Sequence, residues 1–139
     1  MRAFAVALLV LLAGCSTSPT DPSEATAVPS ERVLKFAEKP DGEYATLVLR
    51  RDRGFAGGGC YLAVSVDGDR VAMLEPREQA VLYLPPGDYV VGTAAEGRGL
   101  CSLASDGRAR DVTLRAGQVR TYRLFTDQNG NMDVVASPN

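Results

Sequence analysis

The 139-residue sequence has no histidine and no tryptophan, and only two of its 15 basic residues are lysines. Without histidine, a Ser-His-Asp or Cys-His catalytic arrangement and a histidine-ligated metal are excluded. The formal net charge is −2, so the chain also lacks the basic excess with which proteins bind nucleic acid. We therefore expect a protein that is not an enzyme, with no cofactor, no metal site and no nucleic-acid partner.

Long apolar runs are also absent, because the longest, residues 3–13, has 11 residues and is too short to remain as a membrane-spanning helix. A single basic residue, Arg2, precedes this run, and Leu12-Ala13-Gly14-Cys15 ends it. The order of charge, apolar run, small residues and cysteine closely resembles a bacterial lipobox. The resemblance implies that residues 1–14 are a signal peptide removed before Cys15, and that Cys15 carries a lipid anchor. The alternative is an ordinary secretory signal with an incidental cysteine.

Ser16 follows the expected lipidation site. In lipoproteins of enteric-type bacteria, aspartate at this position favours retention in the inner membrane. The resemblance therefore implies that a Gram-negative host would sort this protein to the outer membrane, facing the periplasm.

Residues 15–30 have the composition of a spacer. Pro19, Pro22 and Pro29 stand among serines and threonines, and Val28 is the one apolar residue larger than alanine in this stretch. Such a segment buries too little surface to offset its ordering entropy. It predicts a lipidated, disordered tether over residues 15–30, followed by a folded domain over residues 31–139.

Residues 31–139 carry short apolar runs separated by turn residues, without helical periodicity. Residues 60–66 alternate most clearly, and turn signals stand at Asp67-Gly68, Ala116-Gly117 and Asn129-Gly130, each expected to close a hairpin. The pattern predicts an all-β fold, a small β-sandwich of about eight to ten short, mostly antiparallel strands. The expected strands are residues 32–37, 44–50, 60–66, 70–74, 79–84, 88–93, 100–103, 110–114, 118–125 and 132–136.

Residues 44–94 carry a family resemblance. Its motifs are Leu47-Val48-Leu49-Arg50, a glycine-rich loop, Val64-Ser65-Val66-Asp67-Gly68, Val71-Ala72 and Tyr83-Leu84-Pro85-Pro86-Gly87-Asp88-Tyr89. This series is similar to small bacterial lipoproteins with a PEGA-like β domain of unknown function. The resemblance implies a compact β-sandwich and brings no catalytic residues with it.

Two cysteines remain once Cys15 is assigned to the lipid anchor. An even pair in an oxidising compartment favours a disulfide. Cys60 is in phase with Leu62 and Cys101 with Leu103, so both side chains should point into the core. We therefore expect a Cys60–Cys101 disulfide, with two buried thiols or a two-cysteine metal site as the alternatives.

A glycine-rich loop follows a group of arginines in the sequence. The residues concerned are Arg50, Arg51, Arg53, Gly57, Gly58 and Gly59. Consecutive glycine amides can form an anion-binding nest, and arginine binds phosphate or carboxylate through two hydrogen bonds. If the arginines are exposed, the loop is a candidate site for an anionic glycan, a lipid headgroup or a peptide carboxylate. The alternative is a plain connection between two strands.

These patterns together predict a membrane-anchored periplasmic lipoprotein that acts as a non-catalytic binding or structural module of the bacterial envelope. Its expected partners are the membrane, through the lipid on Cys15, and an envelope protein or anionic glycan. The alternative is an inhibitor or immunity-type lipoprotein that blocks an envelope enzyme with the loop at residues 52–59.

Overall fold

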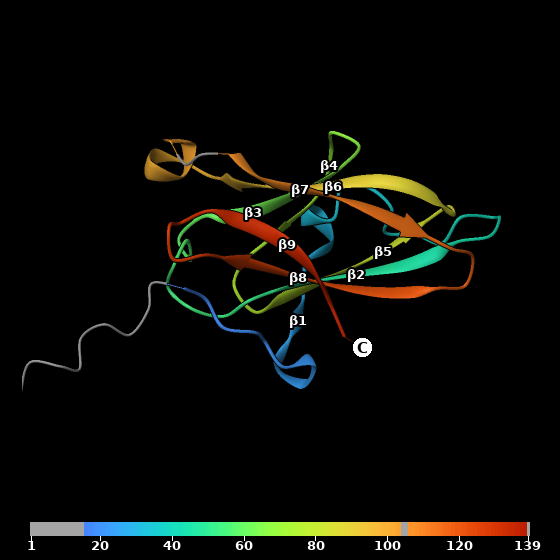
Figure 1. The fold of residues 1–139 in the computed structure, drawn as a ribbon, viewed down its shortest axis with the longest axis horizontal. Helices are drawn as coiled ribbons and strands as arrows, with labels where there is room; N and C mark the ends of the chain where they lie inside the picture. The colour runs from blue at the N-terminus through green and yellow to red at the C-terminus, as the bar shows by residue number, and fades with distance from the viewer. Residues whose placement is uncertain (1–15, 104–105, 139) are drawn as a thin grey trace, which may run out of the picture.

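Two β-sheets packed face to face make up the domain (Figure 1). The structure, a computed structural model, describes residues 16–103 and 106–138. Within these ranges one sheet has the strand order β1-β5-β2-β8-β9 and the other the order β4-β3-β6-β7. The predicted all-β sandwich is confirmed. The strands are β1 (Thr26–Ala27), β2 (Ala45–Arg51), β3 (Tyr61–Val66), β4 (Asp69–Leu74), β5 (Glu78–Leu84), β6 (Gly87–Glu96), β7 (Asp106–Leu114), β8 (Val119–Thr126) and β9 (Met132–Ser137).

The core lies between the two sheets, where alternate residues of each strand face inward. Leu47 and Leu49 of β2 are fully buried, opposite Leu82 and Ala80 of β5. On the other sheet, the predicted alternation of β3 is confirmed, because its inward side chains Leu62, Val64 and Val66 are buried. Each fully buried leucine or valine contributes about 1.5–3 kcal/mol relative to an exposed one.

The turn signals differ in what they connect. Asp67-Gly68 joins β3 to β4 with positive φ at both residues, and Asn129-Gly130 joins β8 to β9, so these two hairpins are confirmed. The hairpin expected at Ala116-Gly117 is wrong. β7 belongs to the four-stranded sheet, whereas β8 lies parallel to β2 in the other sheet. Ala116 and Gly117 do form a turn. Their residue types, however, do not indicate which of the two sheets the following strand joins.

Two expected strands, residues 32–37 and 100–103, are absent. The first region is the short 3₁₀ helix η2 (Ser30–Arg32), followed by a single bridge from Val33 to Ala72. Arg32 donates hydrogen bonds of 2.6 Å to both carboxylate oxygens of the buried Glu78. These bonds hold η2 against the start of β5. This bonding raises the pKa of Arg32. The second region is η3 (Gly99–Leu103). Short apolar runs do not distinguish a strand from a helical turn.

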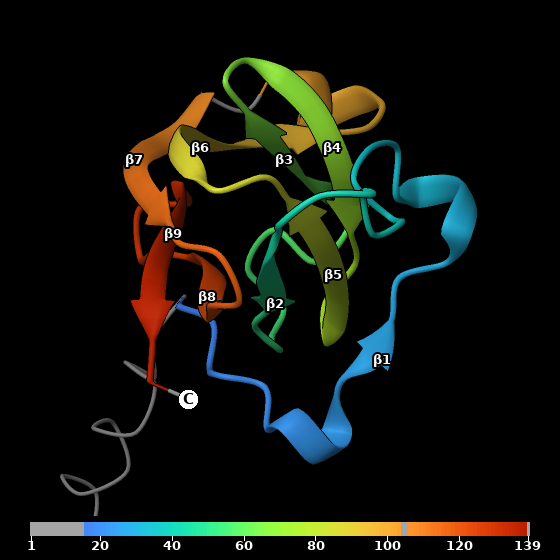
Figure 2. The ribbon, with the colours of Figure 1, turned by 90° about the vertical axis from the view of Figure 1, so that its right-hand side faces the viewer.

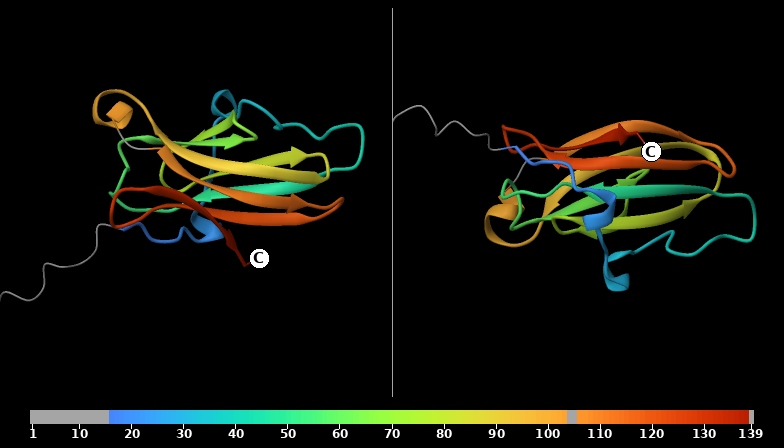
Figure 3. Two further views of the ribbon diagram at one scale, coloured as in Figure 1. Left: turned by 45° about the horizontal axis from the view of Figure 1, so that its top comes forward. Right: turned by 90° about the horizontal axis from the view of Figure 1, so that it is seen from below.

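The segment expected to be a disordered tether is packed against the sandwich. Residues 16–25 cross the outer face of the five-stranded sheet, and β1 then joins the edge of this sheet beside β5 (Figure 2 and Figure 3, right). Ser18 exchanges two backbone hydrogen bonds of 2.9 Å with Arg53, and the side chain of Thr20 donates to the Arg51 carbonyl. Val28 is buried in the core beside β5. Composition missed this because the attachment uses backbone hydrogen bonds, polar side chains and only one large apolar side chain.

We therefore expect the N-terminal segment to stabilise the domain. A chain that begins at Pro29 should lose about 2–4 kcal/mol of unfolding free energy relative to one that begins at Ser16, through lost hydrogen bonds and the burial of Val28. For a domain of this size, the melting temperature should fall by roughly 10–20 °C. Circular dichroism measures the change, with the exposed substitution Ala27→Ser as control. Equal melting temperatures would show that the segment is a spacer after all.

Candidate functional site

The loop between β2 and β3 is organised around the buried side chain of Arg51. This residue ends β2 on the core face and is 3% exposed. Its guanidinium donates hydrogen bonds to the carbonyls of Gly57 (2.8 Å), Cys60 (2.8 Å) and Leu74 (2.5 Å). Desolvation lowers the pKa of Arg51 to about 10, which leaves the group protonated at neutral pH. Arg51 thus holds the loop closed from inside.

The three arginines expected to form an anion site do not converge. Alternation along β2 places Arg50 on the opposite face from Arg51, where its Nε donates to the side chain of Gln79 at 2.9 Å. Arg53 forms an ion pair of 3.6 Å with Glu24 of the N-terminal segment. The condition for the predicted anion site, that these arginines are exposed, is not met by Arg51.

The glycines shape the loop itself. Gly57 has a positive φ, and a Cβ at Gly58 would lie 3.1 Å from the Gly54 carbonyl oxygen. The amide of Gly58 donates to the carbonyl of Phe55, and the amide of Cys60 donates to that of Gly57. These amides close a tight turn, so they are not available to an anion. Gly59 has open space around the position of a Cβ.

The predicted disulfide is confirmed. Cys60 and Cys101 are bonded, with Cα atoms 5.5 Å apart and a sequence separation of 41. The bond joins the β2–β3 loop to η3, which lies between β6 and β7. Two loops from different parts of the chain are therefore fixed together at one end of the sandwich (Figure 1).

We expect this disulfide to be a large part of the stability. A chain beginning at Ser16 should show no reactive thiol when denatured without reductant. Cys101→Ser should cost about 2–5 kcal/mol, because the unfolded chain regains the freedom of a long loop. Ser102→Ala, next to it and exposed, is the control and should change stability by less than about 1 kcal/mol. Two reactive thiols in the native protein would contradict the bond.

A buried carboxylate anchors the start of the N-terminal segment. Asp52 is 2% exposed and accepts hydrogen bonds from Arg123 of β8 at 2.7 and 2.6 Å, and from the hydroxyl of Thr17 at 2.8 Å. The bond to Asp52 raises the pKa of Arg123. Sequence reasoning missed this cluster because its members are 35 and 71 residues away from Asp52 along the chain. It fixes where the chain reaches the sheet.

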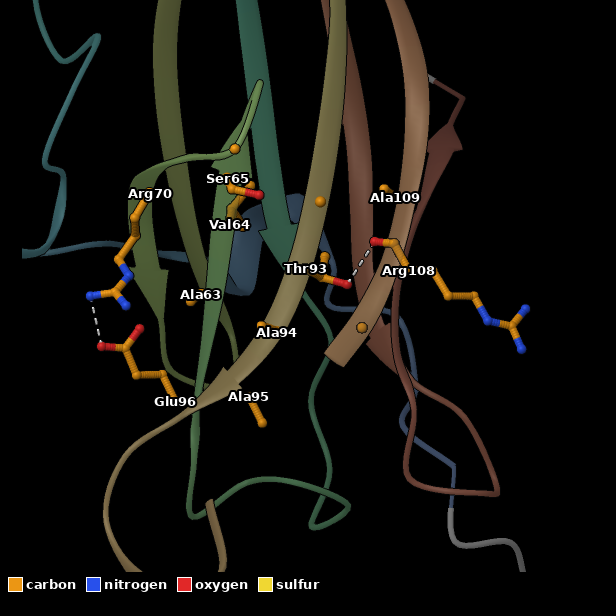
Figure 4. A pocket seen from close by; sticks show the side chains of 13 residues that line it. Ala63, Val64, Ser65, Arg70, Thr93, Ala94, Ala95, Glu96, Arg108 and Ala109 are labelled. Carbon is orange, nitrogen blue, oxygen red and sulfur yellow. Dashed lines mark hydrogen bonds and ion pairs between the residues drawn. The ribbon is translucent and has the colours of Figure 1, made fainter. Parts of the chain in front are cut away.

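The outer face of the four-stranded sheet is a shallow hollow with a volume of about 400 Å³. Small side chains line its floor, and an Arg70–Glu96 ion pair of 2.9 Å and Arg108 stand at its margins (Figure 4). A Cβ at Gly92 would come within 2.8 Å of the Ser65 hydroxyl, so glycine keeps the floor low. The lining residues with small side chains are Ala63, Ser65, Gly68, Gly92, Ala94, Ala95, Gly107 and Ala109. The hollow offers contact area and few directed polar groups, which suits a binding surface.

The described residues hold no metal-type cluster of three or more Cys, Asp or Glu side chains. In the β8–β9 turn, Asp127 accepts hydrogen bonds from the amides of Asn131 and Asn129, and these bonds lower its pKa. Its oxygens thus serve the turn. Over the same described ranges, no helix has the length and apolar character needed to cross a membrane.

No protein-family model matches this chain, and no curated protein matches its sequence. The resemblance to PEGA-like lipoproteins therefore stays a prediction. Cys15, the expected lipidation site, lies outside the described residues.

The neighbours Arg50 and Arg51 provide a matched test of the loop's construction. Arg51→Gln should lower the unfolding free energy by about 3 kcal/mol or more, because one buried and two partly buried carbonyls lose their donor. Arg50→Gln should cost only about 0–1 kcal/mol, because the hydrogen bond from Arg50 to the Gln79 side chain lies on the outer surface of the sheet. Urea denaturation followed by circular dichroism measures both. Equal losses would contradict the internal role of Arg51.

Proposed function

We propose that this chain is an exported lipoprotein whose β-sandwich serves as a non-catalytic binding or structural module of a bacterial envelope. The observation that carries the proposal is the sequence Leu12-Ala13-Gly14-Cys15 directly after an 11-residue apolar run. Cleavage before Cys15 and acylation of its thiol and amine would attach the domain to a membrane. Two or three acyl chains bind a bilayer far more firmly than one.

Two features of the folded domain support export and anchoring. The Cys60–Cys101 disulfide suits an oxidising compartment such as the periplasm. The chain is also packed on the sheet from Thr17 onward, so an anchor at Cys15 would hold the domain close to the membrane surface. Ser16 at the position after the cysteine favours the outer membrane, facing the periplasm.

The hollow on the four-stranded sheet is the surface we assign to a partner, either an envelope protein or an anionic glycan. The N-terminal segment crosses the outer face of the other sheet, whereas the β3-β6-β7 face is open (Figure 2). Small side chains let a flat partner approach the backbone closely, and exposed Arg108 supplies a positive group at the margin.

An inhibitor or immunity-type lipoprotein is the second candidate. The observation that favours it is Phe55, which is fully exposed on a loop braced by Arg51 and the disulfide. A rigid protruding loop with an apolar tip is well suited to enter an active site, because little conformational entropy is lost on binding. This use requires the loop to face away from the membrane.

Lipidation is tested directly on the protein from envelope membranes. Mass spectrometry should find Cys15 as the N-terminal residue, carrying diacylglycerol and an amide-linked acyl chain. Cys15→Ala should move the protein out of the membrane fraction. In an enteric host Ser16→Asp is the matched control for sorting, which should shift the protein to the inner membrane while leaving the lipid in place. An unmodified Cys15, or a mature terminus elsewhere, would overturn the proposal.

A further inference from the structure

Three large apolar side chains are exposed together at one end of the sandwich. Phe55, Leu100 and Leu103 are 103%, 84% and 80% exposed. Phe55 lies in the β2–β3 loop and the two leucines lie on η3, and the Cys60–Cys101 disulfide ties these segments to each other. Large exposed apolar side chains on two tied segments at one end of a domain are typical of a surface that another apolar phase covers.

The N-terminal segment starts at the same end (Figure 1 and Figure 3, left). Thr17 packs against Gly54, the neighbour of Phe55, because a Cβ at Gly54 would lie 3.3 Å from the Thr17 Cα. The Thr17 amide and hydroxyl also bond to the carbonyl of Thr126 at the end of β8. Ser16, the first described residue, directly follows the expected lipidation site in the sequence. The described chain therefore enters the domain beside the β2–β3 loop, immediately after the expected lipidation site in the sequence.

We propose that this end of the domain docks on the lipid bilayer, with Phe55, Leu100 and Leu103 inserted at the boundary between headgroups and acyl chains. The proposal rests on the proposed lipidation of Cys15. A disordered spacer of 15 residues would allow the domain to turn freely about its anchor. Here the packed segment leaves no such spacer, so an anchor at Cys15 forces these loops to face the membrane. A bilayer is accordingly the apolar phase that the geometry favours over a protein partner.

The charges around the loops suit a membrane interface without dominating it. Arg53 and Arg98 flank the apolar tips, and arginine stems can lie along the acyl boundary while the charged head remains in water. Glu24 pairs with Arg53, and Asp127 stands in the nearby β8–β9 turn. Because positive and negative groups are both present, insertion of the apolar side chains should set the orientation. We therefore expect docking to persist at high salt.

The absence of tryptophan makes a single introduced tryptophan a clean reporter of membrane depth. The lipidated protein carrying Phe55→Trp or Leu100→Trp is reconstituted into vesicles of phosphatidylethanolamine and phosphatidylglycerol. Ala116→Trp, in the exposed turn between β7 and β8 at the opposite end, is the matched control (Figure 1). Fluorescence emission and quenching by brominated acyl chains are measured at low and high salt.

Docking predicts that emission from the Phe55→Trp and Leu100→Trp proteins shifts to shorter wavelength. Their quenching by brominated lipid should be several-fold stronger than that of the Ala116→Trp protein, at both salt concentrations. Emission as in water, with quenching no stronger than in the control, overturns the docking. A shift that occurs without vesicles and vanishes on dilution also overturns it, because a second copy of the chain then covers the loops.

Mass spectrometry of the same samples separates this proposal from the proposed function. If Cys15 is acylated and the loop reporters behave like the control, docking fails and the lipoprotein stands. If Cys15 is not acylated, the lipoprotein fails, and the unacylated chain is titrated with the same vesicles. Quenching of the Phe55→Trp reporter there would support docking by the loops alone, whereas its absence would overturn both proposals.

Discussion

One whole end of the molecule depends on the hydrogen bonds that the buried guanidinium of Arg51 donates. It reaches from β2 in one sheet to the carbonyl of Leu74 in β4 of the other, and to two carbonyls of the β2–β3 loop. The Arg51 carbonyl accepts a hydrogen bond from the hydroxyl of Thr20. The next residue, Asp52, accepts hydrogen bonds from the side chains of Thr17 and Arg123. Loop, core end and N-terminal segment are thus fixed by two adjacent residues.

This arrangement determines how the domain would sit on a membrane. An anchor that leads directly into a packed segment transmits the orientation of the chain to the sandwich, whereas a disordered spacer would not. The disulfide at Cys60 and Cys101 holds the second apolar loop beside the first. The hollow on the four-stranded sheet belongs to a face rather than to this end, so the proposed membrane docking and the proposed partner binding would use different surfaces. If the loops insert into lipid, the inhibitor alternative loses its protruding element, since Phe55 is no longer accessible to an enzyme.

Local patterns were sufficient for much of the fold. Leu62, Val64 and Val66 face the core because a strand alternates its side chains, and Asp67-Gly68 forms its turn because both residues tolerate positive φ. The count of cysteines correctly predicted the Cys60–Cys101 bond. The parity argument fails at Cys101, which lies on a 3₁₀ turn, because Leu103, expected on the same inward face, is 80% exposed. The same alternation places Arg50 and Arg51 on opposite faces of β2, a consequence that the predicted anion site did not take into account. Neither the hollow on the β3-β6-β7 face nor the Asp52 cluster has a local signal, because each combines residues from distant strands.

By itself, the sequence determined the class of the fold, most of its strands, the disulfide, and the lipobox pattern that motivates the lipoprotein hypothesis. These depend on side-chain periodicity, turn chemistry and short motifs, which act over a few residues. Only the tertiary structure decided that β7 and β8 lie in different sheets, that Arg51 points inward, and that residues 16–28 pack against the five-stranded sheet. Those outcomes depend on which backbone groups remain without partners once the sheets have formed. Buried carbonyls and strand edges must be satisfied wherever they lie, and the residues that satisfy them can come from anywhere in the chain.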